Sequence, residues 1–247
     1  IPLGDLGTIH LRHQIKQRYG LDCYSWDAPK IASEAIIKEY CNKKNLDINE
    51  FKNIRYEKED FYFGELFNQI NISFKTPLFR KLYLKWYESK NEFSEEFVAF
   101  TDDESSGIKI SVGVGGIHSV NKNEIYEKDD EYEIYDLDIA SLYPQLILNY
   151  NCFRFKELNE IYDHFRLLRI NKSKPNMKKY KGTDKEQFWK NEDLFYKVIL
   201  NGISGYLDMA YSPLYNNKGA MTMRCAGQLI LLYLTEIILE ENIRVIQ

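Results

Sequence analysis

The sequence predicts an α+β fold with a mainly helical N-terminal region, an antiparallel sheet and a helical hairpin. Three observations predict this class. Apolar residues recur at helical spacing within residues 31–40 and 76–89. Short apolar runs on either side of a polar stretch, within residues 97–114, are typical of a β-hairpin. A turn rich in Lys, Pro and Gly at residues 172–183 separates two further helical segments, which indicates an antiparallel helical hairpin.

The N-terminal elements are predicted from local signals. Asp27-Ala28-Pro29 opens a helix in the way an N-cap followed by an early proline does. Residues 45–65 are polar and aromatic without a clear period, and residues 76–89 form the next helix. We therefore expect the first part of the chain to be helical scaffold.

The sheet is expected to contain three parts of the chain. Residues 97–100 and 108–114 form a hairpin around the polar turn 101–107, and Gly115-Gly116 ends its second strand. Residues 133–138 (EIYDLD) have strand character, and residues 244–247 begin a further strand. The hairpin helices are expected at 158–170 and 187–207, and a last, buried helix at 222–240, which is apolar nearly all round its centre.

Composition excludes several classes of protein. The 247 residues, 44% hydrophobic and 28% charged, can bury a core, so the chain is neither disordered nor collagen-like. With 33 basic and 37 acidic residues the net charge is −4, and no global positive field indicates a nucleic-acid partner. Four cysteines without a C-x-x-C pair argue against a zinc site and for reduced thiols, hence a cytoplasmic location.

Membrane association and targeting are not expected. No apolar run reaches the ~18 residues that a membrane helix needs, and no signal peptide follows the opening Ile-Pro-Leu. Because the chain does not open on Met, we expect an internal fragment. The expected oligomeric state is a monomer.

Charge divides between two neighbouring segments. Residues 121–138 hold 2 basic and 8 acidic residues, whereas residues 166–197 hold 10 basic and 4 acidic ones. The first could bind cations and the second polyphosphate. The alternative is that both runs are solvated surface.

Asp136 and Asp138 are candidate cation ligands. Residues two apart on a strand face the same way, so the strand end could present both carboxylates together. Mg²⁺ usually takes one or two carboxylates together with substrate phosphates. The alternative is that Asp138 caps a helix that starts near Ile139.

Two motifs in order resemble family B DNA polymerases, in particular their phage or prophage members. Asp138-x-x-Ser141-Leu142-Tyr143-Pro144 is similar to the first polymerase motif of that family. Lys197-x-x-x-Asn201-x-x-x-Gly205, which begins 59 positions after Asp138, is similar to its K-x-x-x-N-x-x-x-G motif. Helical spacing places the lysine, the asparagine and the glycine on one face.

The resemblance implies domains and a reaction. Residues 1–96 would be a helical region at the end of an exonuclease domain plus linker, 97–157 the first part of a palm, 158–207 the fingers and 208–247 the second part of the palm. The implied function is template-directed DNA synthesis on primer-template DNA from deoxynucleoside triphosphates, with Mg²⁺ in a two-metal mechanism.

The resemblance also assigns roles to residues. Asp138 would bind metal, and Lys197 with Arg166 or Arg169 would hold the triphosphate, as basic side chains do in phosphoryl transfer. Tyr143 would lie under the sugar and exclude a 2′-hydroxyl; its alternative is a core aromatic. The remaining contacts to substrate are assigned to Ser141, Leu142, Asn201 and Gly205, and those to template phosphate to Gly115 and Gly116, which otherwise form an ordinary turn.

The chain departs from the family pattern in three places. Gly113 replaces a tyrosine before the glycine pair, and the second motif carries Gly202 and Ser204 in place of a serine and a tyrosine. The third motif of the family, which bears the second metal-binding aspartate, would lie beyond Gln247, so the fragment is expected to be inactive. Two rival functions remain: a non-catalytic nucleic-acid-binding module, and a metal-dependent nuclease that uses Asp136 and Asp138.

Overall fold

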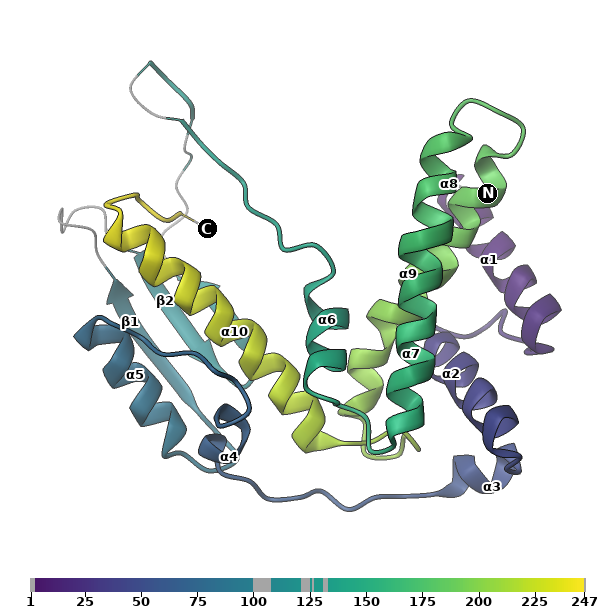
Figure 1. Cartoon of the computed structure of the whole chain (residues 1–247), viewed down its shortest axis with the longest axis horizontal. Coiled ribbons are helices and arrows are strands. Elements are labelled where there is room, and N and C mark those ends of the chain that lie inside the picture. The colour runs from purple at the N-terminus through teal and green to yellow at the C-terminus, as the bar shows by residue number, and fades with distance from the viewer. Residues whose placement is uncertain (1–2, 100–107, 121–124, 126, 131–132, 247) are drawn as a thin grey trace. The chain divides into compact units, whose positions relative to one another are not determined.

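The computed structural model describes residues 3–99, 108–120, 125, 127–130 and 133–246, and confirms the α+β class. The chain forms two compact units, each built from two stretches of sequence (Figure 1). Ile1–Lys58 and Tyr143–Ala220 make the first unit, and Glu59–Leu142 and Met221–Gln247 make the second. This division differs from the four consecutive domains expected from the sequence, because the helical hairpin packs with the N-terminal helices.

The first unit is helical. Asp27 accepts a hydrogen bond from the Lys30 backbone N–H at 2.8 Å and caps the second helix, as the Asp-Ala-Pro signal predicted. Its elements are α1 (Leu3–Tyr19), α2 (Ala28–Lys44), α3 (Ile48–Asn53), α6 (Leu142–Asn149, from Tyr143 onward), α7 (Lys156–Leu168), the π-helical turn η2 (Arg169–Ser173), α8 (Lys174–Lys179) and α9 (Glu186–Leu207).

Helices α2, α7 and α9 form the centre of this unit. Aromatic rings join them to their neighbours: Tyr40 of α2 contacts Phe51 of α3 at 5.1 Å between ring centroids and Phe155 at 5.7 Å. Two ion pairs, Lys43–Glu160 and Lys44–Glu157, link α2 to α7 on the surface. Such exposed pairs contribute little each, so packing of the apolar faces holds the helices together.

The second unit combines a sheet with helices. It contains α4 (Phe63–Phe67), α5 (Pro77–Tyr87), β1 (Ser94–Ala99), β2 (Ile108–Gly113), β3 (Gly116–Ser119) and most of α10 (Asn217–Glu240). The sheet has the order β1-β2-β3 and is antiparallel throughout. Phe97 pairs with Ile110, and Gly113 with Gly116. The predicted hairpin at 97–114 is confirmed, while its turn at 101–107 lies outside the described residues.

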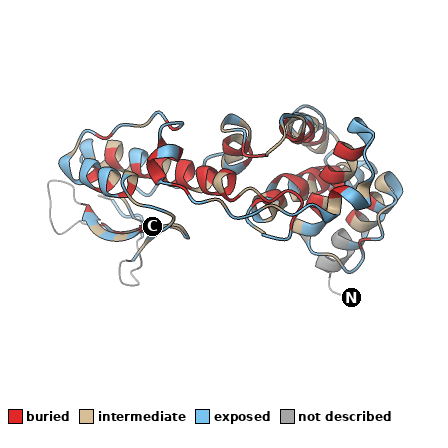
Figure 2. Ribbon diagram, turned by 90° about the horizontal axis from the view of Figure 1, so that it is seen from below, coloured by how far each residue is buried: buried red, intermediate tan, exposed pale blue. Residues whose placement is uncertain are grey.

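One face of the sheet is buried. Ile108, Ile110 and Val112 alternate along β2 with less buried residues, which is the pattern of a strand covered on one side. Helix α5 contacts this sheet through Phe79 and Phe97, whose ring centroids lie 5.6 Å apart. Figure 2 shows that buried residues concentrate on the helices, while the connecting segments are largely exposed.

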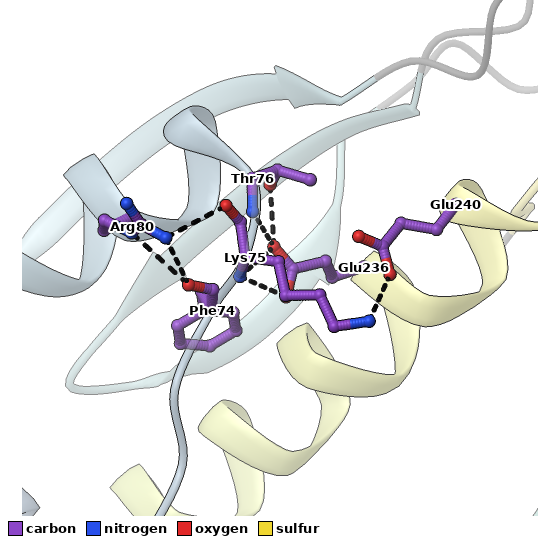
Figure 3. A network of polar contacts seen from close by, with 6 residues as sticks. All are labelled: Phe74, Lys75, Thr76, Arg80, Glu236 and Glu240. Carbon is purple, nitrogen blue, oxygen red and sulfur yellow. Dashed lines mark hydrogen bonds and ion pairs between the residues drawn. The ribbon is translucent and has the colours of Figure 1, made fainter.

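A buried carboxylate joins α10 to the start of α5 (Figure 3). Glu236 is 1% exposed and accepts hydrogen bonds from the backbone N–H groups of Lys75 and Thr76 and from the Thr76 hydroxyl, at 2.7 to 3.1 Å. The first N–H groups of a helix have no partner within the helix and carry its positive end. Lys75 and Thr76 immediately precede Pro77, the first residue of α5, so Glu236 fixes the point at which the chain enters this helix.

Three sequence predictions need correction. Residues 133–138 form no strand: the segment is exposed and irregular between β3 and α6 (Figure 1). Residues 244–246 form no strand either. A strand exists only through hydrogen bonds to a neighbour, and among the described residues neither segment is paired with one; Gln247 lies outside those residues. Finally, the turn expected at 172–183 is largely helical, because η2 and α8 continue α7 as far as Lys179.

Within the described residues, α10 is long and apolar enough to cross a membrane by length and composition alone. Half of its most apolar window is buried inside the structure, and a core helix of a soluble protein passes the same test. This weak evidence agrees with the expected absence of a membrane partner without establishing it. The helix predicted at 222–240 is confirmed, but it is buried only in part: Tyr233 and Leu234 in its second half are 36% and 38% exposed.

Candidate functional site

The motif Lys197-Asn201-Gly205 occupies one exposed face of α9, as its spacing predicted. The opposite face of the same turns is buried, through Phe195, Ile199, Leu200, Ile203 and Leu207. A Cβ atom added at Gly205 would have nothing within 4 Å. In the part of the chain that the structure describes, Lys197 has no ion pair. The face thus presents a cation, an amide and an open stretch of backbone.

A buried tyrosine fixes the middle of this helix. Tyr162 of α7 donates its hydroxyl to the backbone carbonyl of Leu200 at 2.5 Å. Burial raises the pKa of the Tyr162 phenol, because ionisation would place a charge in an apolar interior. The phenol therefore remains a donor at neutral pH, and it holds the turn immediately before Asn201.

Arg166 and Arg169 differ in how they are held. Arg166 pairs with Asp163 one turn earlier on α7, at 2.7 Å. Arg169 makes a two-point contact with Asp193 of α9, at 3.1 and 3.3 Å, between side chains only 11% and 13% exposed. Breaking a buried pair leaves an uncompensated charge and costs about 3–5 kcal/mol. The Arg166–Asp163 pair is less buried, with side chains 20% and 38% exposed. Arg166 is accordingly the freer of the two to change partner.

Asp193 and Glu192 are buried carboxylates next to the candidate site, and the sequence interpretation did not include them. Asp193 also accepts a hydrogen bond from the Ser173 hydroxyl at 3.2 Å, which ties the π-helical turn η2 to α9. Glu192 is buried and pairs with Arg18 of α1. The only signal in the sequence was two adjacent acidic residues in an otherwise basic segment; their partners lie 24 and 174 positions away.

The first motif, which begins at Asp138, starts in a segment without regular secondary structure. Asp136 and Asp138 are exposed in the segment that precedes α6. Helix α6 begins at Leu142, after Ser141 in a left-handed conformation (φ 58°). Asp138 is therefore four residues from the first turn, and the alternative that it caps this helix is wrong. Tyr143 is 52% exposed, so the alternative that its ring fills the core is also wrong.

Gly115 and Gly116 lie at the turn between β2 and β3. Gly116 has φ +147°, a backbone conformation in which a residue with a side chain would be strained. A Cβ atom added at Gly115 would meet nothing within 4 Å. Gln228 of α10 donates to the neighbouring carbonyl of Gly113 at 2.9 Å. The turn is thus open on the outside and anchored to α10.

The predicted site draws on both units. Gly115, Gly116, Asp138, Ser141 and Leu142 belong to the second unit. The residues of the first unit are Tyr143, Arg166, Arg169, Lys197, Asn201 and Gly205. The structure places five of them on the packed elements α7, η2 and α9: Arg166, Arg169, Lys197, Asn201 and Gly205. That Asp138 lies near Lys197 remains a prediction.

The donor set for Mg²⁺ is incomplete among the described residues. No group of three or more His, Cys, Asp or Glu side chains there could hold a metal ion. Asp136 and Asp138 offer at most two carboxylates on one exposed segment. Those two residues do not form a magnesium site by themselves.

Comparison with known proteins adds no relative: no family model, no curated protein and no solved structure matches this chain.

Proposed function

We propose that this chain is the nucleotide-handling part of a DNA polymerase similar to family B. The observation that carries the proposal is the exposed Lys197-Asn201-Gly205 face on a helix whose other side is packed and hydrogen-bonded. The order of the two motifs and the exposed ring of Tyr143 support the same function. The palm is assigned to the β1-β2-β3 sheet with the segment that carries Asp138, and the fingers to α7, η2, α8 and α9.

The proposed reaction is attack of a primer 3′-hydroxyl on the α-phosphate of a deoxynucleoside triphosphate, with release of pyrophosphate. Lys197 holds the triphosphate and offsets its negative charge. Arg166 joins it by exchanging Asp163 for phosphate, while Arg169 keeps its structural pair with Asp193. Asn201 and Gly205 lie against the nascent base pair, and Tyr143 lies under the sugar. Asp138 would be one ligand of Mg²⁺, which supplies charge stabilisation for the attacking and leaving oxygens.

Nucleotide binding tests the α9 face directly. Lys197→Ala should weaken binding of a deoxynucleoside triphosphate to this chain about tenfold or more, since it removes a charge-assisted contact to phosphate. Lys81→Ala is the matched control: it removes an exposed lysine from another helix, α5, outside the candidate site. Calorimetric titration measures both, and equal effects of the two variants would remove the α9 face from the proposal.

Primer extension tests Asp138 in a longer protein that contains this chain and a second metal-binding aspartate. Asp138→Asn should lower the incorporation rate by at least about 100-fold, equivalent to about 2.7 kcal/mol of transition-state stabilisation. Asp136→Asn, two residues earlier on the same segment, should keep most of the activity. A near wild-type rate for Asp138→Asn would contradict the mechanism.

Mixtures of the protein with primer-template, Mg²⁺ and triphosphate also distinguish the rival functions. A nuclease would degrade the primer-template in Mg²⁺ without triphosphate, and would need both Asp136 and Asp138. A non-catalytic binding module would hold primer-template with salt-dependent affinity, and added triphosphate would not tighten that binding.

A further inference from the structure

The end of the helical hairpin carries a dense positive charge that the proposed reaction does not use. Residues 172–190, here called the hairpin tip, include seven lysines and two acidic residues. Six of the lysines are exposed: Lys172, Lys178, Lys179, Lys181, Lys185 and Lys190. The tip contains the end of η2, the whole of α8 and the first residues of α9 (Figure 1). Lys190 lies seven residues before Lys197, about 10 Å along α9.

Few of these charges are neutralised within the protein. Glu186 pairs with Lys190 at 2.7 Å and accepts a hydrogen bond from the Gly182 backbone N–H at 2.6 Å. Across the described ranges of the chain, none of the other six lysines of the tip forms an ion pair with a carboxylate. A structural surface at this charge density normally alternates the signs of its charges. The tip instead keeps a net charge of +5, which suits a polyanion.

Aromatic rings lie among the lysines. Tyr180 and Trp189 stack with an interplanar angle of 9° and 6.3 Å between ring centroids. The ammonium groups of Lys179 and Lys185 lie 5.3 and 5.5 Å from the Tyr180 ring. Phe188 packs edge-on against Trp189 at 5.1 Å and is 52% exposed. About half of Phe188 is therefore exposed to solvent beside the stacked pair Tyr180–Trp189.

The backbone at the tip is defined by local hydrogen bonds. Gly182 has φ +80° and sits in a turn that is closed by the Thr183 N–H to the Tyr180 carbonyl, at 3.1 Å. The Thr183 side chain donates to the same carbonyl at 2.8 Å. A pre-formed turn loses less conformational freedom when it binds a ligand.

We infer that the hairpin tip binds single-stranded nucleic acid. Its lysines contact successive phosphates, and an unpaired base stacks on Phe188. Lysines interleaved with an exposed aromatic ring match the two requirements of such sites, a positive surface along the backbone and a stacking platform. A duplex satisfies only the first requirement, because its bases are already stacked, and a polyphosphate has no bases. This inference stands independently of the proposed polymerase function.

The experiment measures binding of the full chain to two labelled oligomers with the same number of phosphates, a thymidine 12-mer and an abasic 12-mer. Lys178→Gln/Lys181→Gln should weaken binding to both about tenfold at low salt. It should also reduce the slope of log affinity against log salt by about 1.4, since each phosphate contact to a single strand contributes about 0.7. The matched control is Lys58→Gln/Lys81→Gln, which removes two exposed lysines elsewhere.

The stacking part has its own variants. Phe188→Ala should weaken binding to the thymidine 12-mer about fivefold or more, which corresponds to ~1 kcal/mol or more for one stacked base, and should leave binding to the abasic 12-mer unchanged. Phe188→Tyr should retain wild-type affinity for both, which distinguishes loss of the ring from loss of the fold. Equal weakening by the tip and control lysine pairs, or an equal effect of Phe188→Ala on both oligomers, would overturn the inference. Neither triphosphate nor Mg²⁺ is present, so the result is independent of the nucleotide-binding test.

Discussion

The two motifs behind the proposed function are supported in opposite ways. The Lys197-Asn201-Gly205 face stands on a 22-residue helix with a packed inner side, whereas residues 133–140 are exposed and belong to no strand. A helix closes its hydrogen bonds within four residues, but a strand needs a neighbour to supply them. The backbone of a motif on a helix is therefore held by the hydrogen bonds of that helix alone. The backbone of a motif on a strand needs a second strand beside it.

Hydrogen exchange provides the sharpest test of this comparison and the largest expected effect. Amide protons of residues 196–203 should exchange about a thousandfold or more slowly than those of residues 134–139, because core helices open only with a substantial fraction of the global unfolding free energy. Mass spectrometry of peptides that cover the two segments measures both rates in one sample. Protection of residues 134–139 within tenfold of the α9 value would show that this segment is hydrogen-bonded.

The same substitution in both regions tests the difference in packing. Leu200→Ala should lower the free energy of unfolding by about 2–5 kcal/mol, because Leu200 is buried and its removal leaves a cavity. Leu137→Ala removes the same atoms from an exposed position and should change it by about 0.5 kcal/mol or less. Urea unfolding followed by circular dichroism gives both values. A cost above about 2 kcal/mol for Leu137→Ala would mean that the segment packs against the protein.

Tyr162→Phe should have the smallest effect on the free energy of unfolding, and that effect should depend on pH. Near pH 8 the loss of the hydrogen bond to Leu200 should lower stability by about 1 kcal/mol. Folding raises the pKa of the Tyr162 phenol, so its contribution to stability is complete below the ordinary pKa of about 10. That contribution is lost as pH rises above 10, at up to about 1.4 kcal/mol per pH unit.

Unfolding midpoints at pH 8 and pH 11 check this prediction. The wild type should lose more stability than Tyr162→Phe between the two values. Tyr24→Phe, which removes one hydroxyl from an exposed ring, is the control and should behave like the wild type. An identical pH dependence of Tyr162→Phe and wild type would show that the phenol does not limit alkaline stability.

Local signals in the sequence predicted much of this fold. The Asp27 cap, the helix at 76–89 and the exposed face of α9 all depend on residues within one or two turns of each other. The alternation at 97–114 predicted a strand pair for the same reason, since the two strands are close in sequence.

Contacts across long stretches of sequence could not be predicted. The sequence shows the charge of Arg169 but not that its guanidinium is committed to Asp193, 24 residues later. Alternation at 133–138 indicates strand propensity, but no local signal states whether a neighbouring strand is present. The sequence therefore supplied the residues of the candidate site. The different ion pairs of Arg166 and Arg169 could be found only in the structure.

The carboxylate of Glu236 has a consequence for how the protein is made. Thr76 leaves the ribosome 160 residues before Glu236, whose carboxylate accepts the hydrogen bond from its hydroxyl. At about 5–20 residues per second, that interval lasts roughly 8–32 s. During this time α4, α5 and the strands are synthesised without α10, so the N–H groups of Lys75 and Thr76 lack the carboxylate that accepts their hydrogen bonds. We therefore expect the second unit to complete its fold only after α10 has been synthesised.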